Sequence, residues 1–299
     1  MSAGTVIEEV VDFDCAQARL WGIVSRPAGD VIASTTVVLI IVGGPQYRVG
    51  SHRQFVSLAR TLAAAGFPTM RFDATGMGDS EGDKRGFEDL QPDIAAALDA
   101  LSRACPGSQR MVVWGLCDAA SAAMMFATND PRVAGIVAAN PWARSDASLA
   151  AAQVKYYYAA RVLQRDFWSK LLHGELQWGA SLRSLATNLK GARSHRRDGA
   201  THDRSFHATM ARGLAAFRGR VLLILSGNDL TAKEFVEHAN SSHAWSGLLS
   251  DPKVSRLELP QADHTFSRQS WREEIEKQTV AWLNSLGDSR CAVATNATH

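Results

Sequence analysis

Hydrophobic and polar positions along this chain follow two alternating patterns. Short runs of β-branched and other apolar residues, typical of strands buried on both faces, are followed by longer segments with helical spacing. Thr36–Val42 is one such run, and the helix Ser51–Ala65 follows it, closed by Gly66. The opening segments Thr5–Val11 and Arg19–Val24 predict an antiparallel pair of strands.

The alternation continues along the chain with one long interruption. Further strands are predicted at Phe67–Asp73, Met111–Trp114, Val133–Ala139, Val221–Leu225 and Val254–Leu259. Further helices are predicted at Phe87–Ala104, Cys117–Ala127, Lys233–Leu248 and Trp271–Leu286. The interruption has no strand pattern and contains three helical stretches, near Ala147–His173, Ser181–Leu189 and Asp203–Ala216.

This order predicts an α/β fold in which helices flank a mostly parallel central sheet. A helical cap is inserted after the sixth strand. We expect the core to comprise residues 1–140 and 220–287, the cap residues 141–219, and a flexible tail residues 288–299.

Composition narrows the class of protein. The chain has 299 residues, of which 46% are hydrophobic and 21% charged, as in ordinary globular domains. A net charge of +2 gives no argument for a nucleic-acid partner, and no apolar run is long enough for a transmembrane segment. The acidic N-terminus lacks the pattern of a signal peptide. The four cysteines, at positions 15, 105, 117 and 291, are too scattered for a disulfide framework or a zinc site. We therefore expect no metal or cofactor, and a reducing, cytoplasmic location.

The segment between a strand and a helix at Gly115-Leu116-Cys117-Asp118-Ala119 has the layout of a nucleophile elbow. Such a sharp turn raises one side chain above the sheet, and small residues two positions to either side let it close. Here those residues are Gly115 and Ala119, and the raised residue is Cys117 in place of the usual serine. The alternative is that Cys117 is a small core residue, because free cysteine is often buried.

Two residues further along the chain are predicted to complete a catalytic triad with Cys117. A thiol nucleophile needs a base, and the base needs a group that orients it. Asp229 follows the strand Val221–Leu225, and His264 lies in the loop before the last helix. The order nucleophile, acid, histidine is that of α/β-hydrolases. Asp263 is the rival orienting group, although an adjacent residue seldom reaches its neighbour's imidazole.

An acyl-transfer site also needs backbone donors for the developing oxyanion. The N–H of Asp118 is the first candidate. The second is Gly44 or Gln46 in the loop after Val42, because Pro45 has no N–H.

Three side chains are candidates for substrate binding: Arg48, His52 and Trp142. For Arg48 and His52, solvation at the start of a helix is an equally good explanation. The glycine-rich segment Asp73–Gly82 lacks the ending of a phosphate loop and is interpreted as a tight turn.

The predicted cap is basic. Residues 141–219 contain 13 Lys and Arg against 5 Asp and Glu, an excess of 8 positive charges, and their densest part is Lys190–Arg197. This charge favours an anionic or carrier-bound acyl substrate, and it is also what a solvated surface would show.

These motifs together resemble the α/β-hydrolase superfamily over nearly the whole chain. The segments Gly43–Arg48, Trp114–Ser121 and Asn140–Trp142 more narrowly resemble the exosortase A system-associated hydrolase 1 family. The resemblance implies a hydrolase encoded among genes for exopolysaccharide production and protein sorting, with no substrate specified.

The sequence thus predicts a cysteine-dependent enzyme that cleaves an ester, thioester or lactone of a small-molecule acyl substrate through a thioester acyl-enzyme. Transfer of the acyl group to an alcohol or amine is the main alternative within this chemistry. A binding protein that keeps the fold without turnover, and a redox sensor at Cys117, are the alternatives outside it.

Overall fold

A single eight-stranded sheet forms the centre of the molecule. The computed structural model describes residues 6–28, 34–44, 46–143 and 199–291. The strand order is β1-β2-β4-β3-β5-β6-β7-β8, with β1 and β2 antiparallel to their neighbours and the others parallel. The strands are β1 (Val6–Cys15), β2 (Ala18–Pro27), β3 (Thr36–Ile41), β4 (Thr69–Phe72), β5 (Arg110–Leu116), β6 (Val133–Ala139), β7 (Arg220–Ser226) and β8 (Val254–Leu259).

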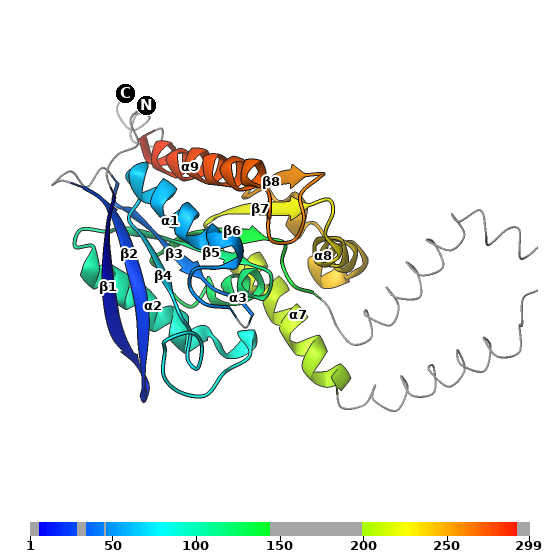
Figure 1. Ribbon diagram of the computed structural model, residues 1–299. Helices are drawn as coiled ribbons and strands as arrows, with labels where there is room; N and C mark the ends of the chain where they lie inside the picture. The colour runs from blue at the N-terminus through cyan, green and yellow to red at the C-terminus, as the bar shows by residue number, and fades with distance from the viewer. Residues whose placement is uncertain (1–5, 29–33, 45, 144–198, 292–299) are drawn as a thin grey trace, which may run out of the picture. The chain divides into compact units, whose positions relative to one another are not determined.

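Helices cover both faces of this sheet (Figure 1). The α-helices are α1 (Gln54–Ala64), α2 (Gln91–Ala104), α3 (Asp118–Phe126), α7 (Gly199–Ala216), α8 (Leu230–Ser241) and α9 (Gln269–Cys291). Short 3₁₀ turns lie at Ser51–Arg53, Phe87–Asp89, His243–Trp245 and Leu248–Ser250. Helices α1 and α9 lie together on one face, and α2 and α3 cover the other.

The central strands are apolar on both sides because both faces are covered. Every residue of β3 is buried. Val38 and Ile40 of β3 belong to one hydrophobic cluster. The same cluster contains Phe55 of α1, Trp114 of β5 and Trp282 of α9. This core holds the strand ends in fixed positions, and the loops that leave those ends carry the candidate site.

The α/β-hydrolase fold predicted from the sequence is confirmed, and the observed strands differ from the predicted ones by a few residues at their ends. The loop after β4 is a tight turn, as expected, with positive φ angles at Gly76, Gly78 and Gly82.

Two helices end well away from their predicted C-terminal ends. Helix α8 ends at Ser241 instead of continuing to Leu248, because Ser242 adopts an extended conformation (φ −97°, ψ 125°). Helix α9 continues past Gly287 to Cys291, five residues beyond the predicted end at Leu286.

The described core belongs to a compact unit of Met1–Trp142 and Thr209–His299, and Ala143–Ala208 forms a second unit. The predicted cap falls mainly on residues 144–198, which lie outside the described residues, as do its basic cluster Lys190–Arg197 and the stretches Ala147–His173 and Ser181–Leu189. The third stretch is helix α7. The predicted domain boundaries stay a prediction. Among the described helices, none combines the length and apolar character needed to cross a bilayer.

Candidate active site

The turn from β5 into α3 holds Cys117 in a strained conformation. Its φ of 64° and ψ of −125° are unusual for a residue with a Cβ, and such strain is typical of functional positions. The turn closes because its flanking residues are small: a Cβ on Gly115 would lie 2.5 Å from the backbone of Ala119, which is fully buried. Cys117 itself is half-buried, in contrast to the buried Cys15 and Cys105. Cys117 therefore lies at the apex of a sharp strand-to-helix turn, with its thiol partly exposed.

His264 lies beside Cys117 and is held by Asp229. Its Nδ1 is 2.8 Å from Oδ2 of Asp229. The pKa of His264 is raised from 6.5 to about 10, first by this hydrogen bond and second by hydrogen bonding with the Cys117 side chain, although burial acts in the opposite direction. An imidazole with such a pKa is protonated at neutral pH, so it can donate a proton to a neighbouring group.

Asp229 is fixed by the start of helix α8. As the N-cap residue it accepts hydrogen bonds from the N–H groups of Thr231 (3.0 Å) and Ala232 (3.2 Å), which would otherwise have no helical partner. The N–H of Asn228 donates to Ala262, so the loop after β7 is tied to the loop that carries His264. Asp229 therefore reaches the imidazole from a rigid position.

The rival orienting residue, Asp263, is engaged elsewhere. Its carboxylate accepts hydrogen bonds from the backbone N–H of Ser267 (2.9 Å) and from the Ser267 hydroxyl. The structure thus pairs His264 with Asp229 and gives Asp263 the role of closing the turn before α9.

Asn140 is a contributor that the sequence did not identify as part of the site. It lies at the end of β6, is fully buried and has a φ of 43°. Its amide donates to the carbonyl of His264 (3.1 Å) and to the hydroxyl of Ser226 (2.9 Å), and accepts from the Ser226 N–H (2.8 Å). Asparagine tolerates the left-handed conformation better than most residues. The only sequence signal was an Asn before a Pro at a strand end.

The predicted oxyanion donors are less free than expected. The N–H of Gly44 donates to Oδ2 of Asp118 at 2.9 Å, and the N–H of Gln46 donates to the carbonyl of Gly44 at 2.9 Å. The N–H of Asp118 lies at the first position of α3, where no helical partner exists. In the structure, both candidates for the second donor are therefore already hydrogen-bonded within the protein.

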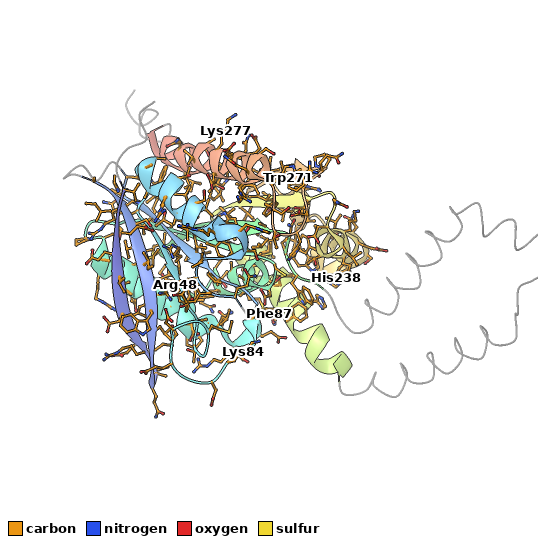
Figure 2. The ribbon with its side chains drawn as sticks, in the orientation of Figure 1. Arg48, Lys84, Phe87, His238, Trp271 and Lys277 are labelled. Carbon is orange, nitrogen blue, oxygen red and sulfur yellow. The ribbon has the colours of Figure 1, made fainter. Side chains whose placement is uncertain are left out.

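Arg48 is used inside the protein and does not face an open site. Its guanidinium pairs with Asp73 and with Asp79, the latter at 2.8 Å, and its N–H donates to Asp73 Oδ1 at 2.7 Å. The side chain is buried within the fold (Figure 2). These bonds anchor the loop after β3 to the end of β4. The carboxylates that bind Arg48 therefore belong to the protein itself, whereas the sequence suggested a carboxylate of the substrate.

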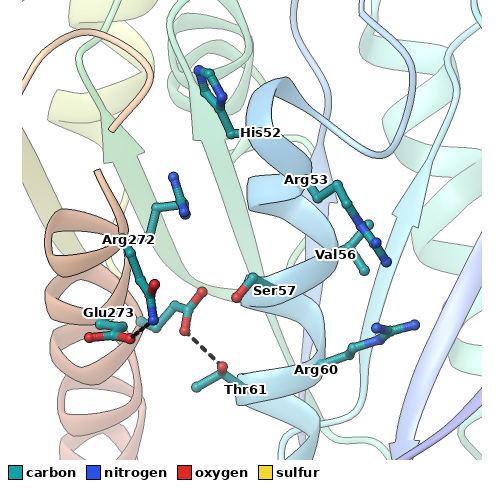
Figure 3. Close-up of a pocket in the computed structure, with 10 residues that line it drawn as sticks. His52, Arg53, Val56, Ser57, Arg60, Thr61, Arg272 and Glu273 are labelled. Carbon is teal, nitrogen blue, oxygen red and sulfur yellow. Dashed lines mark hydrogen bonds between the residues drawn. The ribbon is translucent and has the colours of Figure 1, made fainter. Parts of the chain in front are cut away.

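The other two candidate binding residues lie in different places. His52 lines a cleft of about 480 Å³ between α1 and α9, together with Arg53, Arg272 and Glu273 (Figure 3). Neither Cys117 nor its proposed partners line this cleft. Trp142 is tied to the elbow through its backbone, because its N–H donates to the carbonyl of Cys117 at 3.1 Å. Roles for both in substrate binding stay predictions.

Residues 36–226, well over half of the chain, match the model of a protein family described as serine aminopeptidase, S33. The chain belongs to this family of α/β hydrolases. A search of curated proteins finds no match. Membership supports a hydrolase, and the narrower exosortase-associated family is not confirmed.

Solved structures with the same fold include hydrolases from archaea and bacteria. The esterase Pf2001 of Pyrococcus furiosus is 17% identical, with a TM-score of 0.61 over 93% of this chain and 92% of that one. Est1E of Butyrivibrio proteoclasticus, solved with ferulic acid bound, is 15% identical, with a TM-score of 0.60 over 92% and 98%. A CIB-like hydrolase predicted in Thermoplasma acidophilum is 13% identical, with a TM-score of 0.56 over 94% and 100%. At these identities the likeness extends to the fold alone.

Proposed function

We propose that this protein is a cysteine-dependent acyl hydrolase that cleaves carboxylic esters or thioesters through a thioester acyl-enzyme. Cys117 is the nucleophile, His264 the acid and base, and Asp229 the group that orients the imidazole. The family description names serine, and this chain carries cysteine at the elbow. The proposal therefore keeps the family's reaction class and changes the nucleophile.

The reaction has two stages. The sulfur of Cys117 attacks the carbonyl carbon, and the resulting tetrahedral oxyanion is stabilised by backbone donors that include the N–H of Asp118. As the C–O or C–S bond to the leaving group breaks, the imidazolium of His264 gives it a proton. Water then attacks the thioester, His264 takes a proton from that water, and the acid leaves as the thiolate reforms.

One observation carries the proposal. A cysteine in a strained, left-handed turn lies next to an imidazole whose other nitrogen is 2.8 Å from a buried carboxylate. A core cysteine would need neither the strain nor the imidazole. The pairing also supports a nucleophile over a redox sensor, because Cys15 and Cys105 are both buried.

The same acyl-enzyme would also support transfer to an alcohol or amine, since thioesters react readily with both. The motif resemblance favours a substrate linked to exopolysaccharide production. Addition of a hydroxylamine acceptor would separate the two outcomes, because a transferase yields the hydroxamate in preference to the free acid.

The test is turnover of small aryl esters and acyl-thioesters by matched cysteine variants. Cys117→Ala should lose about 10³-fold or more in kcat, whereas Cys105→Ala, a change at a buried free cysteine, should keep wild-type kinetics. Cys117→Ser should retain weak ester cleavage, because the hydroxyl occupies the same place with lower nucleophilicity. Full activity of Cys117→Ala would refute the proposal.

A further inference from the structure

The carboxylate of Asp118 accepts a hydrogen bond from the backbone N–H of Gly44, a group that the sequence predicts as the second oxyanion donor. Its Oδ2 accepts the N–H of Gly44 at 2.9 Å, and its Oδ1 accepts the N–H of Ala119 at 2.9 Å. One side chain therefore joins the loop after β3 to the first turn of α3. The residue is half-buried, and this burial raises the pKa of its carboxyl group.

The packing around this carboxylate is tight. A Cβ on Gly43 would lie 2.0 Å from Asp118 Oδ1 and 2.8 Å from the N–H nitrogen of Ala119. Only glycine permits the loop to approach so closely. The Gly43-Gly44 pair thus lets the N–H of Gly44 reach the carboxylate of Asp118.

A carboxylate and a tetrahedral oxyanion make the same demand on an N–H group, because each is a negatively charged oxygen acceptor. Gly44 has one N–H, and it cannot serve both with full strength. A fixed negative charge beside the reacting carbonyl also opposes the negative charge that develops on it.

On the basis of the proposed function, we propose that Asp118 is an internal competitor for the oxyanion: its carboxylate holds the Gly44 N–H in the resting enzyme, and an acyl substrate must displace it to complete the oxyanion hole. Asp118 has two opposing effects. Its backbone N–H stabilises the oxyanion, and its side chain withholds the second donor. The residue limits acylation and selects for substrates whose binding moves the carboxylate aside.

The alternative is a purely structural clasp, in which Asp118 holds the loop and its loss lowers activity. Asp118→Ala and Asp118→Asn separate the two, because both keep the backbone N–H and both remove the charge. Asp99→Asn, which removes an exposed carboxylate on α2 that pairs with Arg132, is the control for charge. Melting temperatures identify any variant that fails to fold. If Asp118→Ala does not fold, the isosteric Asp118→Asn variant still tests the inference.

Three measurements are made on each variant. The first is the affinity for a simple aliphatic aldehyde, which forms a hemithioacetal on Cys117 and needs the oxyanion hole. The second is the rate of Cys117 alkylation by iodoacetamide, which does not need the hole. The third is the amide proton resonance of Gly44 by NMR, which reports its hydrogen bond independently of any chemistry.

We expect Asp118→Ala to bind the aldehyde about tenfold more tightly and to raise kcat/KM for an aryl ester by a similar factor, since one oxyanion donor is worth at least that much. Asp118→Asn should gain less, because its amide oxygen still accepts from Gly44. The alkylation rate should stay within about twofold of wild type, and the Gly44 resonance should shift, while Asp99→Asn changes nothing.

Weaker aldehyde binding at an unchanged alkylation rate would overturn the inference in favour of the clasp. An unshifted Gly44 resonance in Asp118→Ala would overturn it by removing the contact. If the wild-type protein forms no aldehyde adduct on Cys117, the proposed function fails, and the inference fails with it. If the adduct forms but the Gly44 resonance does not shift in Asp118→Ala, the inference alone fails.

Discussion

Asp229→Asn is the perturbation that tests most about how the site is built. Asparagine keeps the shape of the side chain and one oxygen for the N–H groups at the start of α8, but it removes the charge that faces Nδ1 of His264. The pKa of His264 should then fall from about 10 toward its usual range, because the largest cause of the increase is this carboxylate.

The size of the effect follows from the pKa and the exposure of the ring. The difference between 6.5 and about 10 corresponds to roughly 5 kcal/mol if taken in full. The His264 side chain is 33% exposed, so solvent screens much of this energy. Cys117 supplies part of the increase in pKa, and that part remains in Asp229→Asn. We expect a loss of about 2 kcal/mol in the free energy of unfolding at neutral pH, typical of a charge-assisted hydrogen bond.

Catalysis should fall more steeply than stability. Without the carboxylate the imidazole loses its fixed tautomer and orientation, so kcat/KM should drop by roughly 10³-fold. The assays are urea unfolding followed by tryptophan fluorescence, and aryl ester hydrolysis across the pH range. The pH profile should move to lower pH as the pKa of His264 falls.

Two controls make this result specific. Asp251→Asn removes a carboxylate that also accepts a backbone N–H, from Lys253 at 2.9 Å, but has no contact with the imidazole. Asp263→Asn removes the carboxylate next to His264 that binds Ser267. Both should keep the wild-type pH profile. An Asp229→Asn variant with unchanged kinetics, or an Asp263→Asn variant with the larger loss, would refute the assignment of the orienting group.

Three further predictions concern the surroundings of the site. Because the folded-state pKa of His264 is raised, its contribution to stability is complete below about pH 6.5 and is lost as the pH rises through about 10. Between those limits the free energy of unfolding should decrease less in His264→Asn than in the wild-type protein. An equal decrease in both proteins would contradict the assignment. Gly43→Ala should destabilise the protein by about 1–3 kcal/mol, because the new methyl group would overlap Asp118; an unchanged melting temperature would show that the loop is looser than described. Asn140→Asp should lower kcat more than it raises KM, since it sets an acceptor against the carbonyl of His264, and a wild-type kcat would exclude a positioning role.

The fold was accessible from the sequence because its signals are local. The buried run of β3, the glycine that ends α1, and the small residues around Cys117 each encode one conformation over a few positions. The order of the strands then brought Asp229 and His264 to one edge, since parallel strands end at the same side of a sheet.

The contacts that govern the site were not accessible in the same way, because they join residues far apart along the chain. Nothing local to Gly44 indicates that its N–H donates to a carboxylate 74 positions away. The sequence left Arg48 open between a substrate contact and a solvated residue at the start of a helix, because its partners Asp73 and Asp79 follow a different strand. The early end of α8 depends on the backbone of Ser242, for which a helical hydrophobic pattern gives no warning.

The proposed catalysis requires the sulfur of Cys117 to form a bond to the acyl group of the substrate. The direct measurement is mass spectrometry of protein quenched with acid shortly after mixing with an aryl ester, followed by peptide mapping. We expect an added acyl mass on the peptide that contains Cys117 in the wild-type protein, and no such mass in Cys117→Ala. Ester turnover in which the acyl group is found on another residue, or on none while Cys117→Ala remains active, would contradict it.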